Sequence, residues 1–132
     1  MTDQKTMTDG ELFEKRLAVA RDAGAKLREQ GGFSVDSRGG CVYRSSNGNK
    51  CAIGFYIPEE QYDLYFDSDS LGVPHLPERA LPQEIWDLRE EFLRWVQINL
   101  HDNRADGDKR LLSDTEIVNL VTSEWSPAGQ ER

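Results

Sequence analysis

Residues 39–58, GGCVYRSSNGNKCAIGFYIP, contain the pattern that decides the predicted fold. Asn47-Gly48 suits a two-residue β-turn, because both central positions of such a turn need a positive φ angle. Apolar residues lie on both sides of this dipeptide, as in the two strands of a hairpin. The stretch therefore predicts a β-hairpin with three cross-strand pairs: Ser46 with Asn49, Arg44 with Cys51, and Val42 with Ile53.

The two cysteines, Cys41 and Cys51, lie in opposite strands of this hairpin. In this register their side chains point to opposite faces, whereas a disulfide needs α-carbons within about 7 Å and converging side chains. Cys51 shares its face with Val42, Ile53 and Phe55, so we expect a buried, free thiol at position 51. A three-residue loop in place of the two-residue turn would reverse this alternation of faces.

Two capping boxes predict the first and last helices. Thr8 with Glu11, followed by apolar residues at helical spacing, predicts a helix over about residues 9–30. Ser113 with Glu116 predicts the start of a final helix in the same way.

Prolines mark the starts of two further helices, because proline is favoured at the first helical position. Pro58 predicts a short helix, and Pro82 predicts a central apolar helix that runs to Leu100. The predicted fold is therefore α+β: a helix, a β-hairpin, a short helix, a long central helix and a final helix. These elements form a single domain over residues 8–125, with flexible tails at residues 1–7 and 126–132.

The charge of the 132-residue chain is acidic and unevenly distributed. The net charge is −8, and residues 51–102 alone hold eleven acidic residues against three basic ones. Direct nucleic-acid binding depends on clustered lysine and arginine, so this composition argues against it. The acidic charge either attracts a basic surface of another protein or serves solubility alone.

Neither a membrane segment nor a secretion signal is predicted. The longest apolar run, CAIGFYI, is far shorter than the roughly 20 residues of a membrane-spanning helix. The N-terminal residues lack a basic start followed by an apolar stretch. We therefore expect a cytoplasmic protein with reduced thiols and no membrane contact.

Four short patterns resemble a group of small proteins encoded by bacteriophages and prophages. They are Gly40-Cys41-x-Tyr43-Arg44, Gly48-x-Lys50-Cys51-Ala52-Ile53-Gly54, Ile57-Pro58-x-x-x-Tyr62 and Leu93-x-x-x-Gln97-x-x-x-His101-Asp102. The resemblance covers roughly residues 28–102, and the group usually has leucine where this chain has Tyr56. It implies a phage origin and a bacterial host cell rather than a reaction. Many small acidic phage proteins bind and inhibit a host protein, including defence complexes, so the resemblance implies a host protein as the partner.

One alternative is a cysteine-dependent hydrolase. Cys51 would be the nucleophile, His101 its base, and Asp102 or Asp63 the group that orients the imidazole. The predicted apolar surroundings of Cys51 oppose this role, because they raise the pKa of a thiol.

A second alternative is a metal site. Cys41, Cys51, His75 and His101 supply four zinc-type ligands, but the cysteines lack the spacing of two to four residues that is usual in structural zinc sites. His101-Asp102 with His75 also suggests a metal-dependent phosphohydrolase, although His75 lies in a proline-rich loop. We favour no metal and expect no cofactor.

The favoured function is binding through a surface in the acidic middle of the chain. Aromatic residues among charges are typical of interface hot spots. The predicted partner-binding residues are Glu59, Glu60, Tyr62, Asp63, Tyr65, Asp67 and Asp69. The sequence leaves the oligomeric state open.

Overall fold

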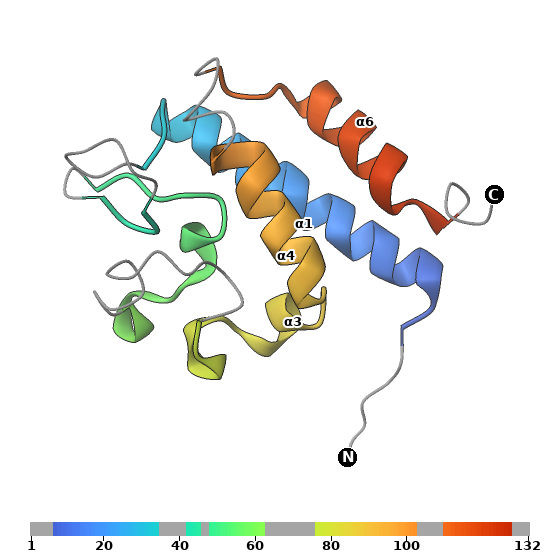
Figure 1. The fold of residues 1–132 in the computed structure, drawn as a ribbon, viewed down its shortest axis with the longest axis horizontal. Helices are drawn as coiled ribbons and strands as arrows, with labels where there is room; N and C mark the ends of the chain where they lie inside the picture. The colour runs from blue at the N-terminus through green and yellow to red at the C-terminus, as the bar shows by residue number, and fades with distance from the viewer. Residues whose placement is uncertain (1–6, 35–41, 46–47, 63–75, 103–109, 128–132) are drawn as a thin grey trace.

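Three helices form the framework of the protein (Figure 1): α1 (Asp9–Gln30), α4 (Glu90–Val96) and α6 (Asp114–Trp125). This computed structural model describes residues 7–34, 42–45, 48–62, 76–102 and 110–127. In the view of Figure 1, α4 crosses in front of α1, α6 runs along α1, and residues 42–45 and 48–62 lie to the left of α4. Of the predicted tails 1–7 and 126–132, only residues 7, 126 and 127 lie within the described ranges.

The predicted first helix is confirmed, including both of its ends. The Glu11 N–H donates to Thr8 Oγ1 over 3.0 Å, and the Thr8 N–H donates to Glu11 Oε1 over 2.9 Å, which completes the capping box. Gly31 ends the helix with φ of 86°, and its N–H bonds to the Leu27 carbonyl. Glycine adopts this left-handed conformation without a Cβ penalty.

The predicted final helix is confirmed as well. Ser113 and Glu116 form the second capping box at the start of α6. The hydrogen bond from Arg110, followed by the one from the Ser113 N–H, lowers the pKa of Glu116 to about 2. The carboxylate of Glu116 therefore stays ionised and keeps its capping role at neutral pH.

The predicted β-hairpin is wrong, and with it the α+β fold class: the described part of the chain is mostly helical and contains no strand. Only an isolated antiparallel bridge joins Arg44 and Lys50. The predicted partner of Arg44 was Cys51, so the register is shifted by one residue. The loop between Ser45 and Asn49 has three residues, and Gly48 within it has φ of 93°. An odd loop length reverses which side chains share a face.

The bridge does not extend into strands because the chain turns directly after it. The Phe55 N–H bonds to the Cys51 carbonyl over 3.2 Å, and the 3₁₀ turn η1 (Gly54–Tyr56) follows, with the Tyr56 N–H bonded to the Ile53 carbonyl over 2.9 Å. A Cβ atom at Gly54 would lie 2.3 Å from the Tyr43 carbonyl oxygen, so only glycine fits where the turn meets the preceding segment.

The helix predicted at Pro58 is shorter than expected. A single 3₁₀ turn, η2 (Glu59–Gln61), follows the proline. Beyond residues 63–75, a further 3₁₀ turn, η4 (Glu78–Ala80), precedes the helical region that begins after Pro82.

The predicted continuous helix from Pro82 to Leu100 is broken near its start. It consists of α3 (Gln83–Trp86), then α4, and then a π-helical segment, η5 (Gln97–Asp102). In a continuous helix the Leu88 carbonyl would accept from the Phe92 N–H. Here the Arg16 Nε–H donates to the Leu88 carbonyl over 3.0 Å, and the Phe92 N–H bonds to the Arg89 carbonyl. Arg89 has φ of 82° and ψ of 140° at this break.

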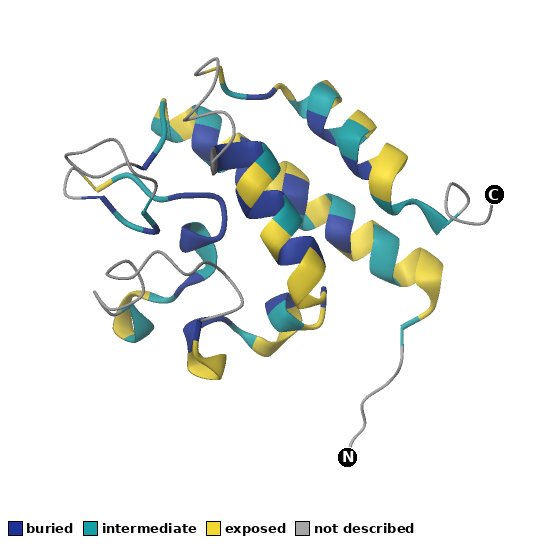
Figure 2. Cartoon of the chain, viewed as in Figure 1, coloured by how far each residue is buried: buried dark blue, intermediate teal, exposed yellow. Residues whose placement is uncertain are grey.

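The helices bury a common core, drawn in dark blue in Figure 2. Its fully buried side chains come from α1, from the segment after the bridge, from α4 and η5, and from α6; they include Leu27, Ile53, Phe92, Leu93, Val96, Leu100, Ile117 and Val121. Gly24 allows α6 to approach α1, because a Cβ atom there would lie 2.1 Å from Ile117 Cδ1. Arg21 adds a bidentate contact to Asp114 at the start of α6, with distances of 3.0 and 2.9 Å.

We predict that Arg89→Gly stabilises the protein. A non-glycine residue in this region of φ and ψ costs about 1–3 kcal/mol, which glycine largely avoids. Chemical denaturation should therefore show a gain in the free energy of unfolding of about 1 kcal/mol.

Arg94→Gly is the matched control, since Arg94 is exposed inside α4. It should lower the free energy of unfolding by about 1 kcal/mol, the usual cost of glycine in a helix interior. Equal destabilisation by both variants would show that Arg89 is not strained.

Candidate functional site

Cys51 is buried, as the sequence predicts, with no exposed surface. Its Sγ atom accepts a hydrogen bond from the Gly54 N–H over 3.2 Å. The backbone bond from the Cys51 N–H to the Tyr43 carbonyl places these two residues opposite each other, in place of the predicted Arg44–Cys51 pair. Burial of Tyr43, Ser45 and Cys51 follows from the new register, because all three lie on the inner face.

His101 is also fully buried, near the end of η5. Its Nε2 atom accepts a hydrogen bond from the Ser34 backbone N–H over 2.8 Å, and its ring packs edge-on against Phe33 at 5.4 Å. An imidazole nitrogen that accepts from an N–H uses its lone pair, so the proton of the neutral ring lies on Nδ1. The lone pair that a general base would use is therefore engaged by the backbone.

These contacts do not favour the cysteine hydrolase. The hydrogen bonds described here for Cys51 and His101 lead to backbone amides of two different segments. Asp63 and the side chain of Asp102 lie outside what the structure describes.

The zinc-type ligands are only partly described. Cys51 and His101 are buried, whereas Cys41 and His75 lie outside the described residues. Within the described ranges, no three histidine, cysteine or acidic side chains are placed so that they could bind a metal ion.

Gln97 has a role that the sequence reasoning missed. Its Oε1 atom accepts a hydrogen bond from the Ile53 N–H over 3.0 Å inside the core. Gln97 and His101 are four residues apart in η5, and both accept from backbone N–H groups of non-helical segments. Two polar residues at this spacing, on the face that also carries Leu93, Val96 and Leu100, were the available signal.

Gln30, the last residue of α1, acts in a similar way on Lys50. Its Oε1 accepts from the Lys50 N–H, and its Nε2 donates to the Lys50 carbonyl, both over 2.8 Å. The amide side chain thus occupies the position that a neighbouring strand would take. Asn49 adds a bond from its Nδ2 to the Phe33 carbonyl over 3.1 Å.

Tyr56, the position at which the phage proteins of the sequence comparison usually have leucine, connects η1 to α1. Its hydroxyl donates to Asp22 Oδ2 over 2.5 Å, and burial raises its pKa. The hydrogen bonds from Lys26 and then Tyr56 lower the pKa of Asp22. A phenol with a raised pKa stays protonated, so it acts here as a hydrogen-bond donor.

The predicted partner-binding residues that the structure describes lie on and beside η2. Glu59 and Glu60 are exposed and Tyr62 is half-buried, while Asp63, Tyr65, Asp67 and Asp69 lie outside the described residues. Arg44 pairs with Glu59 over 2.9 Å, and its guanidinium carbon lies 4.3 Å from the centre of the Tyr62 ring. The Arg44 side chain is only 20% exposed, whereas the Glu59 side chain is 73% exposed.

The acidic region continues from η2 onto η4 and α3. Arg79 Nη1 donates to the Gln61 carbonyl over 3.0 Å, which joins η4 to η2, and Trp86 Nε1 donates to the Glu78 carbonyl over 2.8 Å, which joins α3 to η4. Figure 2 shows exposed residues on both 3₁₀ turns and on α3. We call this region the acidic surface; it consists of Glu59, Glu60, Tyr62, Glu78, Glu84 and Asp87.

Comparison with known proteins gives no relative: no protein-family profile, no curated protein and no solved structure matches this chain. Among the described residues, no helix is both long enough and apolar enough to span a membrane.

We predict that the Cys51 thiol reacts with a thiol reagent only when the protein unfolds. Labelling under native conditions should therefore be slow, and denaturant should make it fast. Mass spectrometry of a Cys41→Ser variant isolates the reaction at Cys51. Rapid native labelling below pH 8 would instead indicate an accessible, activated thiolate.

We also predict that Gln97→Leu destabilises the protein by about 1–3 kcal/mol, because the buried Ile53 N–H loses its acceptor. Gln83→Leu is the control, since Gln83 is exposed on α3 and its side chain bonds to the nearby Asp87 in the described part of the chain. This control should change the free energy of unfolding by less than about 0.5 kcal/mol. Equal denaturation midpoints for the two variants would contradict the role of Gln97.

Proposed function

We propose that this chain is a small phage-type accessory protein that binds a host protein in the bacterial cytoplasm and modulates or inhibits it. The binding region is the acidic surface, together with the acidic and aromatic residues predicted between positions 63 and 69. The partner presents a basic surface, such as that of a nucleic-acid-binding protein or a defence complex.

The observation that carries this proposal is the use of the basic side chains inside the acidic surface. Arg44 contacts Glu59 and Tyr62, and Arg79 contacts Gln61. Both arginines are thus engaged within the protein, while the exposed carboxylates of Glu60, Glu78 and Glu84 face outward. A fixed turn with outward negative charge lowers the entropic cost of binding a basic partner.

The charge of the acidic surface supports fast association with such a partner. Residues 76–91 hold five acidic residues and two arginines. Surfaces of opposite charge increase the association rate, and the effect weakens as salt screens it. Tyr62 contributes an aromatic side chain of the kind enriched at interface hot spots.

The alternative functions receive less support from the geometry. A hydrolase needs an accessible thiolate next to a base, whereas Cys51 is fully buried and Nε2 of His101 accepts a backbone hydrogen bond. A zinc-binding role would require Cys41 and His75 to join the buried Cys51 and His101.

The test is charge reversal at two positions of the acidic surface whose side chains make no described contact, Glu60→Lys with Glu78→Lys. The immobilised protein captures its partner from a bacterial lysate, the partner is identified by mass spectrometry, and the dissociation constant is then measured with purified proteins. The double variant should bind at least about ten-fold more weakly, mainly through a slower association rate. The free energy of unfolding should change by less than about 0.5 kcal/mol.

Glu14→Lys with Glu29→Lys is the matched control, because it changes the net charge equally at exposed positions of α1. The control should retain the affinity of the original protein. Equal weakening by both variants would mean that only overall charge matters, and unchanged binding of Glu60→Lys with Glu78→Lys would contradict the proposal.

A further inference from the structure

The break between α3 and α4 holds its backbone in an unfavourable conformation at Arg89. Among the described residues, Arg89 is the non-glycine residue with a positive φ angle. Its φ of 82° and ψ of 140° lie close to a region that glycine alone populates readily. Strain of this kind persists only where the surrounding structure holds the residue in place, and it is common in segments that switch between conformations.

Arg16 holds the break in place from α1. Its side chain is buried, and its Nε–H donates to the Leu88 carbonyl over 3.0 Å. The guanidinium carbon lies 5.2 Å from the centre of the Phe92 ring and 4.7 Å from that of Trp125, which fixes the side chain where α1, α4 and α6 meet. A hydrogen bond from a fixed, charged donor therefore keeps the Leu88 carbonyl out of the helical hydrogen-bond pattern.

The break also leaves helical hydrogen bonds unmade. In a continuous α-helix each N–H bonds to the carbonyl four residues earlier. Here the Arg89 N–H bonds to the Trp86 carbonyl over 2.9 Å, and the Phe92 N–H bonds to the Arg89 carbonyl over 3.1 Å. The N–H groups of Glu90 and Glu91 begin α4 and have no backbone acceptor in the described part of the chain. A continuous helix would supply an acceptor to both groups.

The sequence fits a continuous helix as well as the broken one. Ile85, Leu88, Phe92 and Val96 are buried, and their spacings of three, four and four residues place them on one face of a helix. Residues 83–96 contain neither glycine nor proline. A continuous helix would therefore retain this apolar face and remove the strain at Arg89, but the Leu88 carbonyl would no longer be open to Arg16.

We propose that the break is one of two conformations of a switch, the other being a continuous helix over residues 83–96. The bond from Arg16 favours the broken conformation. The strain at Arg89 and the two N–H groups at the start of α4 favour the continuous one. Since a hydrogen bond from a charged donor and a strained residue have effects of similar size, the continuous helix is a minor state, on the order of 1% of the molecules.

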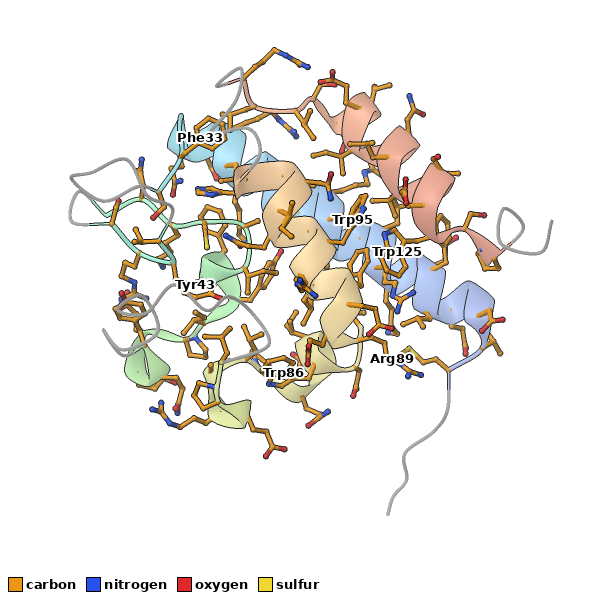
Figure 3. The ribbon with its side chains drawn as sticks, viewed as in Figure 1. Phe33, Tyr43, Trp86, Arg89, Trp95 and Trp125 are labelled. Carbon is orange, nitrogen blue, oxygen red and sulfur yellow. The ribbon has the colours of Figure 1, made fainter. Side chains whose placement is uncertain are left out.

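The switch acts on the acidic surface, because α3 carries part of it. Arg79 Nη1 bonds to the Gln61 carbonyl and Trp86 Nε1 bonds to the Glu78 carbonyl, so η2, η4 and α3 are joined while the helix is broken. Figure 3 shows the Trp86 and Arg89 side chains on opposite sides of the junction between α3 and α4. A continuous helix redirects α3, so the carboxylates of η4 and α3 shift relative to those of η2.

A basic partner that contacts η2 and α3 together therefore stabilises the broken helix, because it binds the two conformations with different affinity. This consequence rests on the function proposed for the acidic surface, whereas the equilibrium between the two conformations does not. The switch can thus be measured in the protein alone.

The experiment compares Arg89→Gly with Arg89→Ala in the full chain, without a partner. Both variants remove the same charge, but glycine tolerates the broken conformation, whereas alanine is strained in it and favours a helix. Relaxation-dispersion NMR of the amides of residues 87–92 should show exchange in the original chain, stronger exchange in Arg89→Ala and none in Arg89→Gly. The minor-state populations of the two variants should differ at least about ten-fold, and the minor-state Cα shifts of Leu88 and Glu90 should be helical.

Two further variants separate the effect of Arg16 from a general effect on α4. Arg16→Met removes the bond to Leu88 and should raise the minor-state population at least about ten-fold. Arg94→Ala, at an exposed position inside α4, is the control and should leave the dispersion unchanged. If Arg16→Met does not fold, the two Arg89 variants still decide the matter.

Flat dispersion profiles in the original chain and in Arg89→Ala would overturn the proposal. Exchange of equal amplitude in Arg89→Ala and Arg89→Gly, or minor-state shifts that are not helical, would overturn it as well. A failure of the partner-binding proposal would leave these spectra unchanged, so the two failures can be told apart.

Discussion

Hydrogen bonds from helix side chains to the backbone of the non-helical segment are the interaction on which the rest of this structure depends. Gln30 bonds to both backbone groups of Lys50, Gln97 accepts from the Ile53 N–H, and His101 accepts from the Ser34 N–H. Buried backbone groups need partners, and strands normally supply them. Here amide and imidazole side chains of α1 and η5 replace a strand, so the segment can pack against helices without forming a sheet.

This arrangement determines which residues remain for function. His101 and Cys51, the pair that suggested catalysis, both have hydrogen bonds to backbone amides in the core. The outward-facing groups are the carboxylates near η2, η4 and α3, where the arginines contact neighbouring protein groups. Arg16 differs, because its Nε–H bonds to the Leu88 carbonyl inside the protein and its guanidinium packs against Phe92 and against Trp125, which lies beside Trp95 in Figure 3.

Local signals allowed the sequence to predict α1 and α6, since the capping boxes of Thr8 and Ser113 are complete within four residues. The hairpin prediction failed because Asn47-Gly48 does not by itself fix the loop length, and the acceptor for the Ile53 N–H lies 44 residues away on Gln97. The break at Arg89 depends on Arg16, 72 residues from Leu88, so helical periodicity could not reveal it. Burial of Cys51 was predicted correctly although the register was wrong. Cys51 has a small, apolar side chain and apolar neighbours in the sequence, which favour the core in either register.

Native-state hydrogen exchange of the backbone amides of Ser34, Lys50 and Ile53 tests the central claim most directly. None of the three lies in a helix or an extended strand, so ordinary loop amides at these positions would exchange within the intrinsic time of an unstructured chain. If side chains replace a strand as described, these amides should be protected to a degree similar to that of core helical amides such as Val96. Exchange of all three at the rates of an unstructured peptide, with Val96 still protected, would contradict the account.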